Sequence, residues 1–275
     1  MNWRLKLKLW GVRGSIPTPV ARNLGYGGNT SCLEIRLPSG ELFIFDAGTG
    51  IRELGLALKQ DPADAQRDIH LFLTHFHWDH IQGLPFFGQL YDPKVAMTFY
   101  SSCYACALRE SIAGQMTDPY FPVNFEAIAS NKHFENLGPK PITLSELTVH
   151  PFPLNHPQGA GGYRIESGGA RIVYATDREH GNDTLDSVMR EYAQDADILI
   201  HDAQYTPEEY PRFKGFGHST WEEAVNVARE CNVKQLILFH HDPNHDDDAV
   251  SAIVESARAR FPNTIGGREG WECTV

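Results

Sequence analysis

The stretch Thr74-His75-Phe76-His77-Trp78-Asp79-His80 places three histidines and one aspartate in a single short loop. It follows an apolar run, residues 69–73, whose composition predicts a buried strand. A loop that leaves a rigid strand is a common position for catalytic residues. Its nitrogen and oxygen donors suit zinc, manganese or iron, and differ from the thiolate donors of a structural zinc finger.

The spacing of these donors predicts two metal ions. Consecutive side chains in a tight turn diverge, so the four donors cannot all bind one tetrahedral ion. Alternate residues point the same way, and we therefore expect His75 and His77 to share one ion. Asp79 and His80 can then face a second ion. The alternative, a polar surface turn with accidental histidines, does not account for the further candidate ligands downstream.

The motif His75-x-His77-x-Asp79-His80 resembles the signature of the metallo-β-lactamase superfamily. The residues after it, Ile81-Gln82-Gly83-Leu84-Pro85, resemble the phosphodiesterase branch, which includes ribonuclease Z and small cyclic-phosphate phosphodiesterases. The resemblance runs from about Gly11 to His241. It implies an α/β protein with a four-layer αβ/βα sandwich, whereas periodicity alone predicts only a mixed α/β fold. We take residues 1–275 as a single hydrolase domain.

Three more candidate ligands follow extended apolar runs further along the chain. His156 is the expected third ligand of the ion held by His75 and His77. Asp177 follows a strand, and the resemblance implies that its carboxylate bridges the two ions. One histidine of the pair His240-His241 should complete the second ion. The resemblance favours His240, with His241 as the alternative.

A helix start near the end of the chain contributes a further histidine. Thr220-x-x-Glu223 fits a capping box that opens a helix over residues 221–231. His218 therefore precedes a helix N-terminus, where backbone N–H groups favour an anion. In ribonuclease Z a strand ending in His-Glu-Ala is followed by Gly-His-Ser-Thr, and here the carboxylate is Asp202. Its shorter side chain leaves open whether it contacts His218 directly, and a backbone-bonded His218 is the structural alternative.

Two other regions have open interpretations. Asp46 follows a predicted strand, residues 42–45, and either orients a metal-bound histidine or bonds its own backbone in a turn. Residues 101–141 contain recurring aromatic side chains, and either cover the site as a lid or pack against the core. Residues 84–90 read as the start of an apolar helix, and residues 104–116 as a helix.

Charge and composition restrict the partners. The 275 residues carry 24 basic and 35 acidic side chains, for a net charge of −11, and no lysine or arginine cluster stands out. A protein that binds a long polyanion needs a basic face, so long nucleic acid is disfavoured. We expect a small phosphodiester or a cyclic nucleotide-like molecule instead. A homodimer is compatible with this composition.

The sequence also predicts the cellular location and the state of the cysteines. No apolar run approaches the roughly 20 residues needed to span a bilayer, and the N-terminus alternates like a strand rather than a signal peptide. We therefore expect a cytoplasmic protein without membrane contact. The five cysteines are an odd, widely spaced set, which argues against a disulfide framework. Cys103 and Cys106 are expected to be packed thiols, with a metal or redox role as the alternative.

These residues predict a hydrolase with two divalent metal ions, with zinc expected first and manganese or iron as alternatives. Three ligands for each ion and one bridge leave coordination positions open, as in catalytic sites. Two cations lower the pKa of a shared water, and the resulting hydroxide is expected to attack phosphorus. His218 would stabilise the developing charge or protonate the leaving oxygen, and Asp79 can also orient the nucleophile.

The expected activity is hydrolysis of a small cyclic or diester phosphate. One alternative is a ribonuclease Z-like RNA endonuclease, which the acidic charge disfavours. Another is a lactonase or thioesterase of the same superfamily, which has no evident need for His218. A non-catalytic metal sensor is the last alternative, and the complete ligand set argues against it. No P-loop or G-x-S-x-G motif is present.

Overall fold

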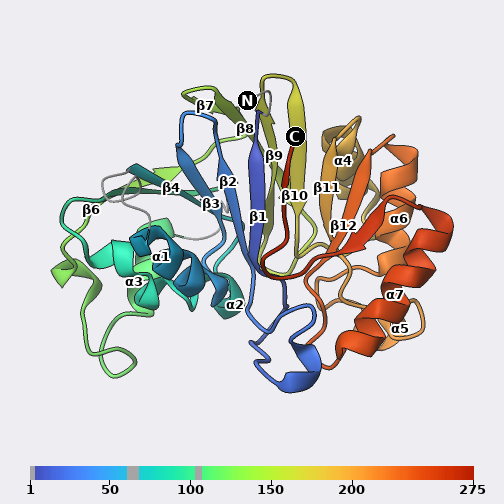
Figure 1. Cartoon of the computed structure of the whole chain (residues 1–275), viewed down its shortest axis with the longest axis horizontal. Helices are drawn as coiled ribbons and strands as arrows, with labels where there is room; N and C mark the ends of the chain where they lie inside the picture. Colours follow the sequence, from blue (N-terminus) through green and yellow to red (C-terminus); the bar gives the residue numbers. More distant parts are fainter. Residues whose placement is uncertain (1–3, 61–67, 103–106) are drawn as a thin grey trace.

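Two seven-stranded sheets lie face to face in the computed structural model, which describes residues 4–60, 68–102 and 107–275 (Figure 1). The first sheet has the order β14-β1-β2-β3-β4-β5-β6, with β3 to β6 running parallel. Its strands are β1 (Lys6–Gly11), β2 (Cys32–Arg36), β3 (Leu42–Phe45), β4 (Asp68–Leu73), β5 (Ala96–Ser101), β6 (Asn131–Asn136) and β14 (Glu272–Thr274).

The second sheet has the order β13-β12-β11-β10-β9-β8-β7. Strands β10 to β13 run parallel, and β9 is antiparallel to both of its neighbours, β8 and β10. The strands are β7 (Ile142–Leu144), β8 (Leu147–Leu154), β9 (Ala160–Ser167), β10 (Ala170–Ala175), β11 (Ile198–Asp202), β12 (Gln235–Phe239) and β13 (Thr264–Gly266).

Helices cover the outer face of each sheet (Figure 1). On the first sheet they are α1 (Gly50–Gln60) and α3 (Leu108–Gly114), and on the second α4 (Asp183–Ala193), α6 (Trp221–Glu230) and α7 (Asp247–Arg260). Shorter turns are α2 (Trp78–Ile81), α5 (Tyr210–Phe213), η1 (Ala21–Asn23), η3 (Leu84–Phe86), η4 (Gly88–Tyr91) and η5 (Phe125–Ala127). The predicted four-layer αβ/βα sandwich is confirmed.

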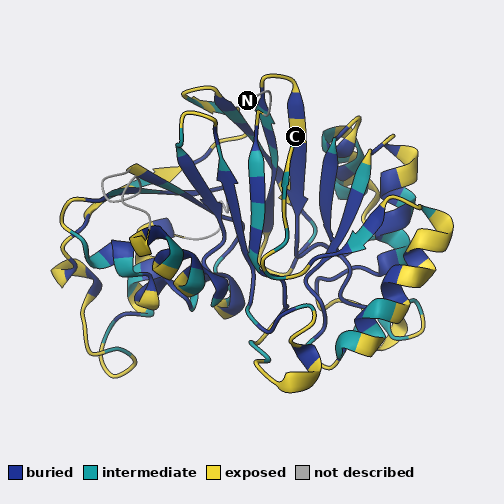
Figure 2. Ribbon diagram, viewed as in Figure 1, coloured by how far each residue is buried: buried dark blue, intermediate teal, exposed yellow. Residues whose placement is uncertain are grey.

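Alternate residues of a strand pack on opposite faces of its sheet, which explains the layers of the sandwich. In β3, Phe43 and Phe45 belong to the core between the sheets, whereas Leu42 and Ile44 pack under the helices of the first sheet. A sheet covered on both faces needs apolar residues on both, so these strands are nearly continuous hydrophobic runs. In Figure 2 the strands are largely buried, and each long helix turns an exposed face to solvent.

Two sequence predictions need correction. The helix expected over residues 84–90 is replaced by the two short 3-10 turns η3 and η4, because the backbone at Phe87 between them is extended. The helix expected over residues 104–116 is shorter, and α3 covers only Leu108–Gly114. Cys103 and Cys106 lie outside the described residues. Cys32, Cys231 and Cys273 are free thiols.

The segment 101–141 is partly a regular element of the sheet. Strand β6 pairs with β5 in parallel at the edge of the first sheet. Phe125 is buried in the core under that sheet, and Phe121 and Phe134 pack against it. Packing therefore accounts for these aromatic rings, and a lid role for the remainder stays a prediction. No helix of the described chain is long and apolar enough to cross a membrane.

Candidate metal centre

The strands deliver the predicted site residues to one edge of the sandwich. His156 follows β8, Asp177 follows β10, Asp202 ends β11, and His240 follows β12. These four strands run in the same direction, so their carboxyl ends meet at the same edge. The loop 74–80 begins at the carboxyl end of β4 in the other sheet.

Three residues at strand exits adopt a left-handed backbone. The φ angles are 62° at Asp46, 53° at Asp177 and 60° at His240. Side chains other than glycine rarely occupy this region, and local strain of this kind is concentrated at functional sites. The sharp change of direction turns each side chain from the strand end into the cluster.

Two groups of ligand atoms converge at this edge, and within each group the atoms lie within 4.8 Å of one another. The histidine triad consists of His75, His77 and His156, and the acidic group consists of Asp79, His80, Asp177 and His240. A third set, Asp177, Asp202, His218 and His240, overlaps the acidic group. The structure therefore brings every predicted ligand into one continuous cluster, in which His77 is half-buried and the other ligands are buried.

Asp177 lies between the triad and the acidic group. Its Oδ1 is 3.6 Å from His75 Nε2 and 3.9 Å from His156 Nε2. Its Oδ2 is 3.1 Å from His80 Nε2 and 3.2 Å from His240 Nε2. One oxygen thus faces each group, which is the arrangement that a bridging carboxylate requires.

Every histidine of the two groups uses its other ring nitrogen to donate to an oxygen. His80 Nδ1 donates to Asp46 at 2.8 Å, and His240 Nδ1 to Gln204 at 2.8 Å. The triad is held by Thr74 Oγ1 for His75, Gln158 Oε1 for His77 and the Gly217 carbonyl for His156. Each bond fixes one tautomer and leaves the inner nitrogen with a free lone pair.

The inner nitrogens fit a bound cation. His156 Nε2 and His77 Nδ1 are 3.1 Å apart, and His80 Nε2 and His240 Nε2 are 3.3 Å apart. Two nitrogens that both lack a proton repel each other unless a cation attracts both lone pairs. His75 Nε2 is buried without a hydrogen-bond partner. Burial holds the pKa of His75 well below its usual value, so its imidazole is neutral, the form that binds metal.

The carboxylates of the acidic group also favour a bound cation. Burial would raise the pKa of Asp177, but the neighbouring histidines, chiefly His240 and His80, hold it well below its usual value. The same balance holds the pKa of Asp79 low. This lowering requires positive charge beside the two buried carboxylates, and a bound cation supplies it when the histidines are neutral ligands.

Asp46 is a buried carboxylate with several donors. It accepts hydrogen bonds from His80, from the Thr74 backbone and hydroxyl, and from Tyr174. This favours the orienting role over a local turn.

Thr74, Tyr174 and Gln204 were not singled out from the sequence. Gln204 lies two residues after the predicted Asp202, but its distance from His240 in the chain gives no signal of contact.

His218 contacts Asp202 directly. The Nδ1 atom donates to Asp202 Oδ2 at 2.8 Å, so the shorter carboxylate does reach it. Asp202 Oδ1 accepts from the backbone of Ser219 at 3.0 Å. Burial lowers the pKa of His218, but the charge of Asp202 more than offsets this and raises it to about 9. His218 Nε2 makes no hydrogen bond to another described residue, and its ring stacks on His240 at 4.9 Å.

Glu179 holds the loop before His218. Its carboxylate accepts from the backbone of Gly215 at 2.7 Å and Gly217 at 2.9 Å, and from the Tyr210 hydroxyl at 3.0 Å. Gly217 has a φ of 91°, and a Cβ there would lie 2.3 Å from His156 Nδ1. Glycine is therefore required where this loop passes the triad.

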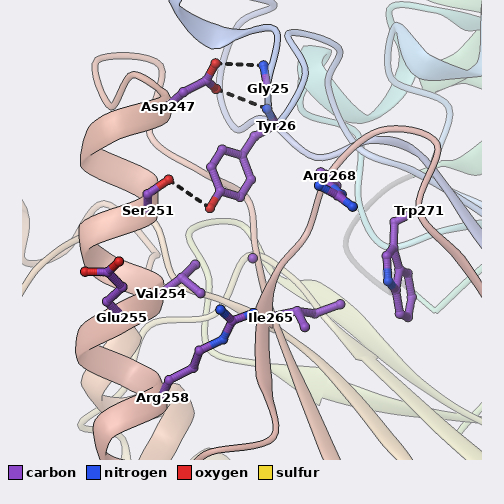
Figure 3. Close-up of a pocket in the computed structure, with 11 residues that line it drawn as sticks. Gly25, Tyr26, Asp247, Ser251, Val254, Glu255, Arg258, Ile265, Arg268 and Trp271 are labelled. Atoms are coloured by element: carbon purple, nitrogen blue, oxygen red, sulfur yellow. Dashed lines mark hydrogen bonds between the residues drawn. The ribbon is translucent and has the colours of Figure 1, made fainter.

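His241 faces away from the cluster. Its Nε2 donates to the Gly267 carbonyl at 2.8 Å, and its ring contacts that of Tyr26. Tyr26 lines a separate cavity of about 470 Å³, which Figure 3 shows together with Arg258, Arg268 and Trp271. No predicted metal ligand lines that cavity. Of the two candidates, His240 is the one that the structure places in the acidic group.

Comparisons with known proteins agree with this geometry. Residues 42–241 match the family described as the beta-lactamase superfamily domain. Ribonuclease Z of Methanosarcina mazei is 27% identical over 98% of both chains. A diphosphatase of the PhnP family has a TM-score of 0.71 at 19% identity, covering 99% of this chain and 97% of the other. Human short-form tRNase Z has a TM-score of 0.69 at 19% identity, covering 98% and 99%.

The chain belongs to the metallo-β-lactamase superfamily. Its full-length similarity to ribonuclease Z and its fold place it in the branch with the PhnP-like proteins. Together with the buried histidine and aspartate cluster, this defines a metal-dependent hydrolase.

Proposed function

We propose that this metal-dependent phosphodiesterase hydrolyses a small cyclic or diester phosphate at a dinuclear centre. One ion would be held by the histidine triad and the other by Asp79, His80 and His240, with Asp177 as the bridge. Zinc is the expected metal, with manganese or iron as alternatives, because the donors are nitrogen and oxygen. When bound, the ions would activate a water and neutralise the phosphate oxygens.

The observation that carries this proposal is the anchoring of all five histidines. Each outer ring nitrogen donates to an oxygen, and each inner nitrogen faces the cluster. Partners of this kind orient metal ligands and raise their basicity. A purely structural polar cluster has no need to leave so many lone pairs pointing at one another.

The protein's own groups have distinct tasks in this proposal. Asp79 Oδ2 accepts from the Ser15 backbone at 2.7 Å, which holds the carboxylate in the cluster, where it could also orient the nucleophile. Asp202 holds the His218 ring by Nδ1, so that Nε2 remains available. His218 would donate from Nε2 to the leaving oxygen, or stabilise the charge that develops on it.

Two observations bear on the size of the substrate. The net charge of −11 disfavours a long polyanion. The alignment with the Methanosarcina ribonuclease Z runs over 316 positions, more than the 275 residues here, so that relative carries insertions that this chain lacks. The similarity itself supports RNA cleavage as the second candidate, and nucleic acid stays among the possible substrates. A lactonase is disfavoured by the His218–Asp202 pair.

The first test measures nitrophenol release from bis(p-nitrophenyl) phosphate by zinc- or manganese-loaded protein. The monoester, a simple lactone and a precursor tRNA are assayed in parallel. We expect diester turnover that a chelator abolishes and that added metal restores. Lactone turnover without diester turnover would contradict the proposal. Cleavage of the tRNA at far higher kcat/KM than any small cyclic phosphate would select the second candidate.

A further inference from the structure

Two aromatic side chains next to the cluster are exposed to solvent. Trp78 lies between His77 and Asp79 and is 79% exposed. Its ring contacts no other aromatic ring of the described residues. Phe216 precedes Gly217 and is 61% exposed. Most large apolar side chains of the described residues are buried, and these two are exposed next to buried residues of the site.

Hydrogen bonds link the segments that carry these two rings to the histidine triad. His77, the neighbour of Trp78, contacts His156 through its Nδ1 atom at 3.1 Å. His156 in turn donates to the carbonyl of Gly217, the neighbour of Phe216, at 2.8 Å. The backbone that carries each ring is thus bound to the residues expected to hold one ion.

The backbone at both rings is held in place. The loop around Phe216 is held by Glu179, which accepts from the N–H groups on either side of it. Trp78 begins the short helix α2, in which the neighbouring Asp79 and His80 are buried. Ile16 is also 58% exposed, and it follows Ser15, whose N–H donates to Asp79.

Single exposed apolar residues are common on protein surfaces and need no function. Here both rings instead lie directly next in sequence to residues of the histidine triad or of its hydrogen-bond partners, on backbone that hydrogen bonds hold. A flat apolar surface beside a phosphate site matches a molecule that joins a phosphate to a planar aromatic group. Stacking of a base on an aromatic side chain tolerates any base, because each has a π-face.

We propose that Trp78 and Phe216 bind the base of a nucleotide substrate, so that the preferred diesters are nucleotides rather than base-free sugar or glycerol phosphates. This rests on the proposed phosphodiesterase function. Trp78 offers the larger and more exposed surface, so it would contribute more to the preference than Phe216. Loss of one stacking ring weakens binding by about 5- to 150-fold.

The test compares AMP with ribose 5-phosphate, which differ by the base. Dissociation constants are measured by calorimetry with zinc-loaded wild-type protein, Trp78→Ala and Phe216→Ala. We expect wild type to bind AMP at least about 10-fold more tightly than ribose 5-phosphate. In Trp78→Ala that ratio should fall towards one, and Trp78→Phe should restore much of it. The variant Leu56→Ala removes an exposed apolar side chain from α1 and should leave the ratio unchanged.

Equal affinity of wild type for the two ligands would overturn the proposal, as would an AMP preference that survives both alanine substitutions. The diester assay keeps this separate from the proposed function. Protein that binds AMP through Trp78 but cleaves no diester would contradict the phosphodiesterase function alone. Protein that cleaves diesters without any base preference would contradict only the role of these rings.

Discussion

At the scale of single residues, the hydrogen bond on the outer nitrogen of each histidine decides what that side chain can do. Asp46 and Gln204 accept from His80 and His240, so both of these histidines present Nε2 to the acidic group. His77 is reversed, because Gln158 accepts from its Nε2 and leaves Nδ1 facing His156. The choice of nitrogen depends on partners that lie far apart in the chain.

His218 gives the sharpest prediction at this scale. We expect His218→Ala to lower kcat for a phosphodiester by about 10²–10³, the range for a lost acid or electrostatic stabiliser. Its metal content, measured by atomic absorption, should not change. His133→Ala is the matched control, since His133 is exposed on the edge strand β6. Loss of one ion from His218→Ala would instead mean that His218 is a ligand in the overlapping third set.

At the scale of elements, strand ends and helix starts position the site. The chain reaches Asp177, Asp202 and His240 at or just after the ends of the parallel strands β10, β11 and β12. Pairing of these strands therefore makes distant sequence positions neighbours. Helix α6 begins directly after the loop that carries His218 and Ser219. Its start therefore influences both the stability of the outer layer and the position of His218.

The contribution of the N-cap of α6 can be tested by measuring the free energy of unfolding. Thr220 Oγ1 accepts from the Glu223 backbone at 3.2 Å. We expect Thr220→Ala to lower the free energy of unfolding by about 1 kcal/mol, the usual cost of a lost N-cap. Thr220→Ser keeps the hydroxyl and should recover most of this loss. Urea denaturation measures both, and an alanine variant as stable as wild type would show that the cap contributes nothing.

At the scale of the whole molecule, the two sheets bury polar groups as well as apolar ones. His201 on β11 is fully buried, accepts from Arg178 at Nε2 and donates to the Asp202 carbonyl at Nδ1. Burial, with the nearby Arg178 charge, lowers its pKa to about 3. Burial also lowers the pKa of His241 to about 3. Both histidines are neutral in the folded protein throughout the physiological range.

This burial predicts a pH-dependent stability. The folded pKa of His201 is about 3 and its usual value is 6.5, so between these the unfolded chain binds a proton that the folded chain does not. Stability is therefore complete above pH 6.5 and falls on acidification by about 1.4 kcal/mol per pH unit. His201→Gln keeps an acceptor for Arg178 and removes the titration.

Urea denaturation of wild type and His201→Gln between pH 7 and pH 4.5 measures the effect. The difference between their slopes should be about 1.4 kcal/mol per pH unit below pH 6. The difference is the informative quantity, because acid also releases metal and titrates the other histidines in both proteins. Parallel slopes would contradict the assignment of His201 as a buried neutral histidine.

Much of this protein follows from the sequence alone. The loop 74–80 has the donor types and spacing of a metal site, and its motif indicated the superfamily and hence the sandwich. The apolar runs before His156, Asp177 and His240 placed those residues at strand exits. These features are local, because strand periodicity and donor chemistry depend on neighbouring residues.

The tertiary structure decided what depends on contacts between distant segments. It placed His240 rather than His241 in the acidic group, brought Asp202 within 2.8 Å of His218, and supplied Gln204 as the partner of His240. It also linked the segments of Phe216 and Trp78 through the bonds from His156 to Gly217 and to His77. A hydrogen bond between strands has no counterpart in local sequence, because sheet pairing and the left-handed turns at strand ends create it.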